Sequence, residues 1–109
     1  MSDAYTRLKL EHDGAVASVV LNRPEIHDAF DDVTIVELTQ AFEHLGADEA
    51  TRVIVLRSTG KHFSAGADLN WMRRIADYSE EENREDARTL ERMFRAIATC
   101  PKPVVARVQ

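Results

Sequence analysis

The chain has 109 residues, 44% apolar and 30% charged, a composition typical of a soluble globular domain rather than a disordered segment. Its formal charge of -5 argues against a nucleic-acid-binding surface, and it has no run of about 18 apolar residues that could span a membrane. The N-terminus lacks the basic start and apolar core of a signal peptide. The single cysteine, Cys100, excludes an intramolecular disulfide and fits a reducing compartment, so we expect a cytoplasmic protein.

The first half of the chain predicts two strands followed by a helix. Residues 8–11 alternate between leucine and a charged residue, as in a half-buried strand. Asp13-Gly14 is a hairpin-turn signal, and the apolar residues 15–21 after it predict a second, more buried strand. A group of aspartates then precedes apolar residues at helical spacing, and Gly46 is a residue type that commonly follows a helix C-terminus. We therefore predict a helix that ends at Leu45.

The second half of the chain predicts a buried strand, two helices and a fourth strand. Residues 53–57 are an apolar run typical of a buried strand, and a short helix is expected after residue 69. Ser79 and the glutamates after it form a capping-box pattern at the start of a longer helix. Pro101 stops this helix, and residues 104–108 predict the last strand. The apolar stripe expected on the longer helix consists of Leu90, Met93, Phe94 and Ile97.

Helices that alternate with apolar strands indicate an α/β fold with parallel pairing. The sequence contains no internal repeat, linker or domain boundary, so residues 1–109 are expected to belong to one domain. A parallel α/β unit usually covers each strand with a following helix, and the sequence stops at a predicted strand. We therefore expect the sequence to be part of a larger domain.

A run of small residues within segment 61–69 lies between the third predicted strand and the short helix. Small side chains let a ligand approach the backbone closely, and Gly66 permits backbone angles that other residues avoid. The first N–H groups of a helix have no partner within the helix and can hold a developing negative charge. The alternative is a purely structural turn, because most strand-to-helix turns bind nothing. The segment matches neither the P-loop pattern nor the dinucleotide-binding fingerprint.

Three motifs, in this order and at this spacing, resemble the crotonase superfamily, whose best-known members are enoyl-CoA hydratases and isomerases. They are Val19–Pro24 followed by Asp28–Phe30, then Lys61–Leu69, then Pro101–Gln109. Trp71-Met72 and the stretch from Tyr78 to Ala87 are most similar to the methylglutaconyl-CoA hydratase branch. The resemblance implies an α/β, crotonase-like (ClpP/crotonase) fold of repeated β-β-α units, with residues 1–109 as its N-terminal portion.

The resemblance also implies the roles of individual residues. The backbone N–H of Ala67 would be one donor of an oxyanion hole that holds the thioester oxygen of an acyl-CoA substrate. Glu25 stands where the family often has a lysine. The flanking residues would be Glu25, Ile26 and His27 along coenzyme A, and Ala65, Gly66, Asp68 and Leu69 beside the acyl-thioester passage. From the residues alone, Asp68 is better explained as the cap of the following helix than as a general acid or base.

The activity that the resemblance implies is an enoyl-CoA hydratase-type lyase. It would add water across the double bond of a branched α,β-unsaturated acyl-CoA through an enolate, in fatty acid or branched-chain amino acid degradation. The alternatives are isomerisation, thioester hydrolysis, or a non-catalytic fragment that only binds coenzyme A or a partner chain. The general acid and base would lie beyond Gln109, so residues 1–109 alone are expected to be inactive. The resemblance further implies a homo-oligomer, a trimer or hexamer, with no separate cofactor, metal, nucleic acid or membrane.

Overall fold

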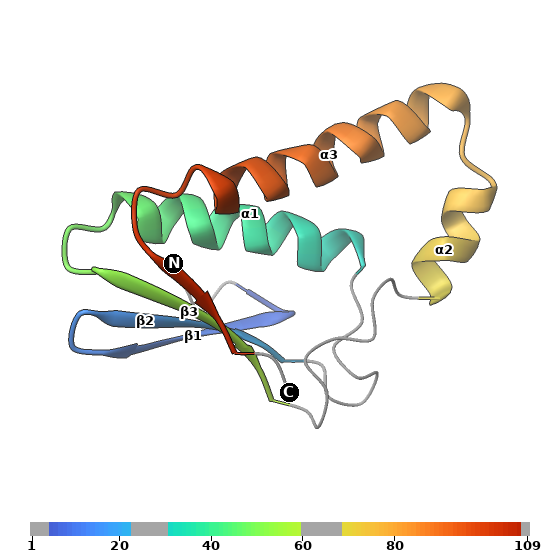
Figure 1. The fold of residues 1–109 in the computed structure, drawn as a ribbon. Coiled ribbons are helices and arrows are strands. Elements are labelled where there is room, and N and C mark those ends of the chain that lie inside the picture. The colour runs from blue at the N-terminus through green and yellow to red at the C-terminus, as the bar shows by residue number, and fades with distance from the viewer. Residues whose placement is uncertain (1–4, 23–30, 60–68, 108–109) are drawn as a thin grey trace.

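The computed structural model describes residues 5–22, 31–59 and 69–107, and within these ranges four strands form one sheet beside three helices (Figure 1). The strands lie in the order β1-β2-β3-β4 across the sheet. This arrangement confirms the predicted α/β fold. The elements in chain order are β1 (Leu8–Asp13), β2 (Val16–Leu21), α1 (Asp32–Ala47), β3 (Val53–Ser58), α2 (Leu69–Ala76), α3 (Glu80–Ala98) and β4 (Val104–Ala106).

The hairpin of β1 and β2 follows from its two-residue turn. The strands are antiparallel, with Leu8 opposite Leu21 and Asp13 opposite Val16. Gly14 in the turn has a φ of 59°, in the left-handed region where a side chain would be strained. The turn predicted from Asp13-Gly14 is therefore confirmed.

The other strand pairs are parallel, as predicted. β2 pairs with β3 so that Leu21 lies opposite Ser58, and β3 pairs with β4 so that Ile54 lies opposite Val104. Helix α1 connects β2 to β3, while α2 and α3 together connect β3 to β4. Because the three parallel strands run in one direction, their carboxyl ends meet at the same edge of the sheet.

The last strand is shorter than predicted. We expected it over residues 104–108, whereas β4 covers only Val104–Ala106. The N–H of Arg107 still donates to the carbonyl of Leu56 at 2.8 Å, so the pairing continues one residue beyond the strand. Residues 108 and 109 lie outside the described ranges.

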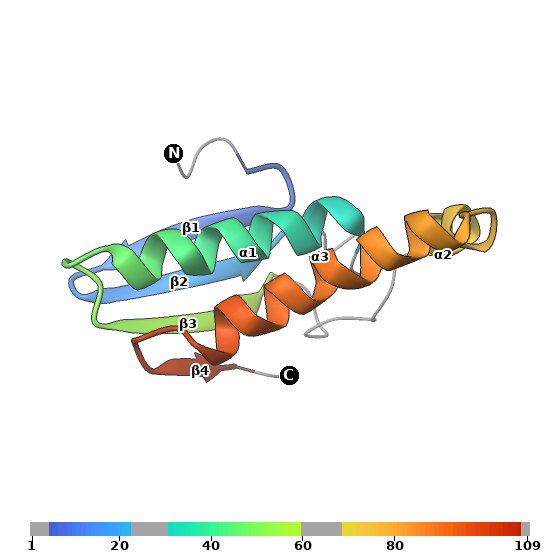
Figure 2. The ribbon, with the colours of Figure 1, turned by 90° about the horizontal axis from the view of Figure 1, so that it is seen from above.

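The hydrophobic core lies between the sheet and two of the helices. Figures 1 and 2 show α1 and α3 side by side on one face of the sheet. Strand side chains alternate between the two faces, so every second residue of β1, β2 and β3 points toward these helices. Removing these side chains from water is the main force that holds the layers together. The core consists of Leu8, Ala17, Val19, Leu21, Ile35, Leu38, Ala41, Phe42, Leu45, Ile54 and Met93.

Helix α1 ends later than predicted, and the glycine that suggested its end has another role. We expected the helix to end at Leu45 with Gly46 just beyond it, but α1 continues to Ala47 and Asp48 is the C-cap. A Cβ atom on Gly46 would lie 3.2 Å from Cδ of Pro101 and 3.6 Å from Sγ of Cys100. The prediction was wrong because this glycine allows the connection from α3 to β4 to approach the helix closely.

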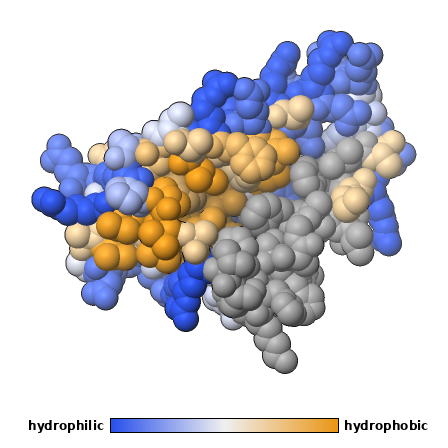
Figure 3. Space-filling view, in the orientation of Figure 1, coloured by the Kyte–Doolittle hydropathy of each residue, from blue (hydrophilic) through white to orange (hydrophobic). Residues whose placement is uncertain are grey.

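Helix α3 begins as predicted but buries only part of its expected stripe. Ser79 accepts a hydrogen bond from the N–H of Glu82, whose carboxylate accepts one from the N–H of Ser79, which confirms the capping box. Met93 is buried in the core, whereas Phe94 is 58% exposed. Val105 of β4 is also 54% exposed, and Figure 3 shows apolar side chains gathered on the face formed by β4 and the adjoining part of α3.

Candidate functional site

The residues predicted to form the site fall almost entirely outside the described ranges. Leu69 is the exception, because it is the first residue of α2. The predicted role of the Ala67 N–H as a donor of an oxyanion hole therefore stays a prediction. The predicted site residues outside the described ranges are Glu25, Ile26, His27, Ala65, Gly66, Ala67 and Asp68.

The described structure does place the ends of the two predicted site segments. Segment 23–30 follows β2, and segment 60–68 follows β3. The two strands are parallel neighbours, and both the N–H and the hydroxyl of Thr59 donate to the carbonyl of Leu21, at 3.1 and 3.3 Å. The described ends that precede the two segments therefore lie side by side at the carboxyl edge of the sheet. In open α/β sheets this edge is where ligands bind.

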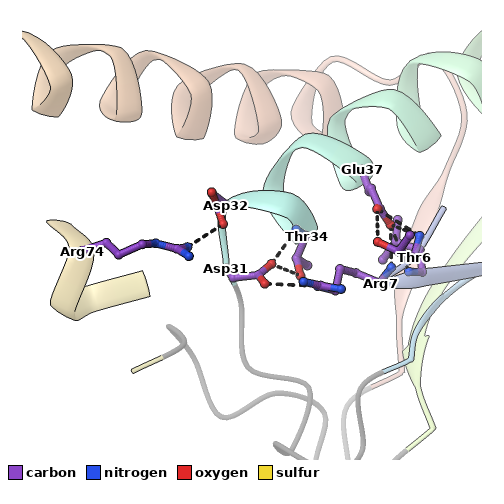
Figure 4. A network of polar contacts seen from close by, with 8 residues as sticks. Thr6, Arg7, Asp31, Asp32, Thr34, Glu37 and Arg74 are labelled. Atoms are coloured by element: carbon purple, nitrogen blue, oxygen red, sulfur yellow. Dashed lines mark hydrogen bonds and ion pairs between the residues drawn. The ribbon is translucent and has the colours of Figure 1, made fainter. Parts of the chain in front are cut away.

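A polar cluster fixes the residue at which segment 23–30 enters α1. The side chain of Asp31 caps the helix, accepting from the N–H and the hydroxyl of Thr34, both at 2.8 Å (Figure 4). Arg7 is the residue just before β1, and its Nε donates to the other carboxylate oxygen of Asp31 at 3.1 Å. Burial alone would raise the pKa of Asp31, but these hydrogen bonds and the Arg7 charge hold the pKa of Asp31 below its ordinary value. Asp31 is therefore a carboxylate stabilised in its ionised form.

Glu37 is a second buried carboxylate in this region, and sequence reasoning missed it. Only 7% of the residue is exposed. It accepts from the N–H groups of Thr6 (3.0 Å), Arg7 (2.8 Å) and Leu8 (3.3 Å), and from the hydroxyl of Thr6 at 2.9 Å (Figure 4). One signal could have found it, because helical spacing places Glu37 on the same face of α1 as the core residues Ala41 and Leu45. A glutamate on a buried helix face needs several donors.

An ion pair connects the helices that follow the two segments. Nη2 of Arg74 in α2 lies 2.9 Å from Oδ1 of Asp32 at the start of α1 (Figure 4). Both side chains are about half exposed, and a pair of this kind contributes only about 0–1 kcal/mol. Burial, and secondarily the charge of Asp32, raises the pKa of Asp86. The ion pair shows that α2 approaches the start of α1.

An acidic hollow of the described surface does not suit coenzyme A. It has a volume of about 440 Å³ and includes Glu81, Glu82, Glu85 and Asp86 in its lining. The phosphates of coenzyme A are anionic, so a lining of carboxylates would repel them. Among the described residues, no group of histidine, cysteine, aspartate or glutamate could hold a metal ion. None of the helices in this part of the chain is long and apolar enough to cross a membrane.

Comparisons with known proteins agree with the fold. The model of the enoyl-CoA hydratase/isomerase family matches residues 11–109. A Thermus thermophilus relative is 42% identical over 95 residues, which are 87% of this chain and 38% of that protein. The crotonyl-CoA hydratase of Syntrophomonas wolfei is 32% identical over 106 residues, which are 96% of this chain and 40% of that enzyme. The crystal structure of an enoyl-CoA hydratase from Shewanella pealeana superposes with a TM-score of 0.96 at 41% identity, covering 99% of this chain and 41% of that one.

The fold and the arrangement of its segments define an α/β protein with the crotonase-like fold, as the sequence predicted. The chain belongs to the enoyl-CoA hydratase/isomerase family. The match covers both predicted site segments, 23–30 and 60–68. The chain spans about two fifths of the length of the relatives it matches.

Proposed function

We propose that the full-length protein adds water across the double bond of an α,β-unsaturated acyl-CoA. The observation that carries this proposal is that the neighbouring parallel strands β2 and β3, which precede segments 23–30 and 60–68 in the sequence, end at the same edge of the sheet. A substrate bound there could lie along the first segment with its coenzyme A moiety and reach the second with its thioester. Membership of the family supports this arrangement.

The proposed chemistry gives the backbone N–H of Ala67 a definite role. Water attacks the β-carbon, the electron pair of the double bond moves to the thioester, and an enolate forms with negative charge on its oxygen. The attacking water gives up one proton and the α-carbon gains one, so that one water is added overall and the thioester is restored. An N–H aimed at that oxygen stabilises the enolate more than the neutral substrate, and one such donor is typically worth about 2.7–4 kcal/mol of barrier. Glu25, Ile26 and His27 would lie along coenzyme A.

We further propose that the reaction needs no separate cofactor or metal, because the thioester itself makes the β-carbon electrophilic. The protein would act as a homo-oligomer, a trimer or hexamer, in the cytoplasm. The proposed acyl group is branched. Similarity to the crotonyl-CoA hydratase of Syntrophomonas wolfei also supports an unbranched, short acyl group. The test therefore includes a branched and an unbranched substrate.

Isomerisation is the second candidate function. A trans-2-decenoyl-[acyl-carrier-protein] isomerase of Streptococcus mutans is 31% identical over 94 residues, which are 85% of this chain. An isomerase would use the same stabilised enolate but return the proton to a different carbon instead of adding water. The product therefore distinguishes the two reactions.

The test is product analysis by mass spectrometry after the full-length protein is incubated with crotonyl-CoA and with methylglutaconyl-CoA. Hydration adds the mass of one water, isomerisation leaves the mass unchanged, and thioester hydrolysis releases free coenzyme A. We expect the hydrated product, formed faster from the branched substrate. A protein that binds coenzyme A and turns over neither substrate would contradict the proposal and support the non-catalytic alternative.

A further inference from the structure

The outer edge of strand β1 carries backbone groups that have no hydrogen-bond partner among the described residues. β1 lies at the end of the four-stranded sheet, beside β2 only. Residues opposite each other in an antiparallel pair alternate between those that exchange backbone hydrogen bonds and those that do not. The N–H of Asn22 donates to the carbonyl of Arg7, so the odd-numbered residues of β1 bond to β2. The N–H and C=O groups of Leu10 and His12 therefore point away from β2.

Helix α1 closes one end of this edge and leaves the other end open. The N–H of Leu8 also points outward, and it donates to Oε1 of Glu37 at 3.3 Å. Closer to the hairpin turn, Leu10 is half-buried and His12 is exposed. Another strand could therefore pair with Leu10 and His12 without displacing any hydrogen bond of the described chain.

The charges of β1 match those of a second, antiparallel β1. Leu10 packs against the core, so Lys9, Glu11 and Asp13 lie on the opposite face of the sheet. A two-fold axis through Glu11, perpendicular to the sheet, places Lys9 opposite Asp13 of the partner subunit on both sides of the axis. Each Glu11 would meet the partner's Glu11, but it is already paired with Arg57 and lies 3.4 Å from Nζ of Lys9. Charges on an edge strand usually prevent pairing, whereas here the outer ones face opposite charges.

We propose that β1 is a contact between two copies of the protein, paired antiparallel about a two-fold axis through Glu11. In this register Leu10 and the partner's His12 exchange their N–H and C=O bonds, and the two four-stranded sheets continue as one. An axis through Leu10 would instead need the N–H of Leu8, which Glu37 already holds. A two-fold contact closes on itself, so it would join two of the proposed trimers into a hexamer, and this last step alone rests on the proposed function.

The test measures the assembly of the full-length protein by sedimentation velocity over a range of concentrations. His12→Pro removes the outward N–H and no bond between β1 and β2, whereas the matched control His12→Ala removes the same side chain and keeps the N–H. We expect the wild type and His12→Ala to form a dimer or hexamer. His12→Pro should dissociate into half-size assemblies, with the Kd of the two-fold contact raised at least about tenfold.

A charge exchange tests the register independently of the backbone. Lys9→Glu places like charges opposite each other and should raise the Kd of the contact about tenfold. Lys9→Glu/Asp13→Lys makes the facing charges opposite again and should restore the wild-type Kd. Residues 9 and 13 lie about 13 Å apart along one strand, so this rescue requires the second copy. Should His12→Pro fail to fold, the charge exchange decides the test.

Several outcomes would overturn the inference. A wild-type protein that sediments as a monomer or trimer at every concentration would do so, as would an assembly unaffected by His12→Pro and Lys9→Glu. Equal dissociation of His12→Ala, or no rescue by the charge exchange, also overturns it. Slow hydrogen exchange at the amides of Leu10 and His12 in the dissociated protein would show that another part of the same chain covers this edge, and would contradict the contact. Sedimentation does not report turnover, so a failure of the proposed reaction leaves the inference standing.

Discussion

Replacement of Glu37 by glutamine tests whether the buried carboxylate holds the start of β1 against α1. The carboxylate has four donors, the N–H groups of Thr6, Arg7 and Leu8 and the hydroxyl of Thr6. Glutamine keeps one oxygen acceptor but turns the other position into an NH₂ donor. The N–H groups of Thr6, Arg7 and Leu8 all reach Oε1 and can keep an amide oxygen there, so Glu37→Gln removes the charge from these contacts and leaves the hydroxyl of Thr6 facing the NH₂ group.

The structure bounds the cost of this change. Thr6 is exposed, so its N–H and hydroxyl can turn to water, whereas Leu8 is buried and Arg7 is half-buried. The loss therefore amounts to the charge of the acceptor in the bonds from Arg7 and Leu8, because a hydrogen bond to a charged group contributes about 1.5–3 kcal/mol and a neutral one about 0.5–1.5 kcal/mol. We expect the free energy of unfolding to fall by about 2–4 kcal/mol, and the Tm of the full-length protein to fall by about 5–15 °C.

The assay is thermal unfolding of the full-length protein followed by circular dichroism, with Glu43→Gln as the matched control. The side chain of Glu43 lies on the same helix but is 56% exposed, and its ion pair with Arg92 spans 3.6 Å. Its replacement should change the free energy of unfolding by no more than about 1 kcal/mol. A Glu37→Gln protein that melts like Glu43→Gln would refute the reasoning. Hydrogen exchange at the amides of Arg7 and Leu8 should be faster in Glu37→Gln alone.

Three further predictions follow from other contacts. Because the folded pKa of Asp31 lies below the value of about 3.9 in the unfolded chain, its contribution is complete above about pH 4 and is lost as the pH falls through the folded pKa. Asp31→Asn should therefore flatten the stability curve below about pH 4 in acid titrations, and an unchanged slope would contradict this. Gly46→Val should lower the free energy of unfolding by about 1–3 kcal/mol in denaturant titrations, because the valine side chain would clash with Pro101. An unchanged midpoint would contradict this prediction and show that Pro101 moves aside without cost. A polypeptide of residues 1–109 alone should show no hydratase activity, and turnover above a buffer control would contradict this. The same polypeptide should associate in sedimentation experiments through the exposed apolar face that includes Phe94 and Val105, and a monodisperse monomer would contradict that association.

Local signals explain most of the fold that the sequence predicted. The Asp13-Gly14 turn and the capping box of Ser79 and Glu82 each depend on residues within four positions of one another, so the sequence alone determines them. Gly46 misled the prediction because its neighbour is Pro101, more than 50 residues away. The spacing of apolar residues shows which of them share a face of a helix. How much of that face is buried depends on the elements that pack against the helix.

Phe94 illustrates the same limit. It directly follows the buried Met93, but α1 and the sheet cover only part of the predicted apolar stripe of α3, and Phe94 lies outside the covered part. The cluster of Arg7, Asp31 and Glu37 could not be predicted as a cluster, because its members lie 24 and 30 residues apart and pair only once β1 lies beside α1. The motifs, in contrast, indicated the family, and the structure adds that β2 and β3, the strands before the two predicted site segments, end side by side.

The most direct test of the account is the rate of crotonyl-CoA hydration by full-length Ala67→Pro and Ala67→Gly proteins. Proline removes the backbone N–H and is tolerated in the first turn of a helix, whereas glycine keeps the N–H and loses only a methyl group. We expect Ala67→Pro to lower kcat/KM by at least about 10² with its fold intact, and Ala67→Gly to stay within about tenfold of the wild type. A correctly folded Ala67→Pro protein with wild-type turnover would contradict the role of this N–H as an oxyanion donor.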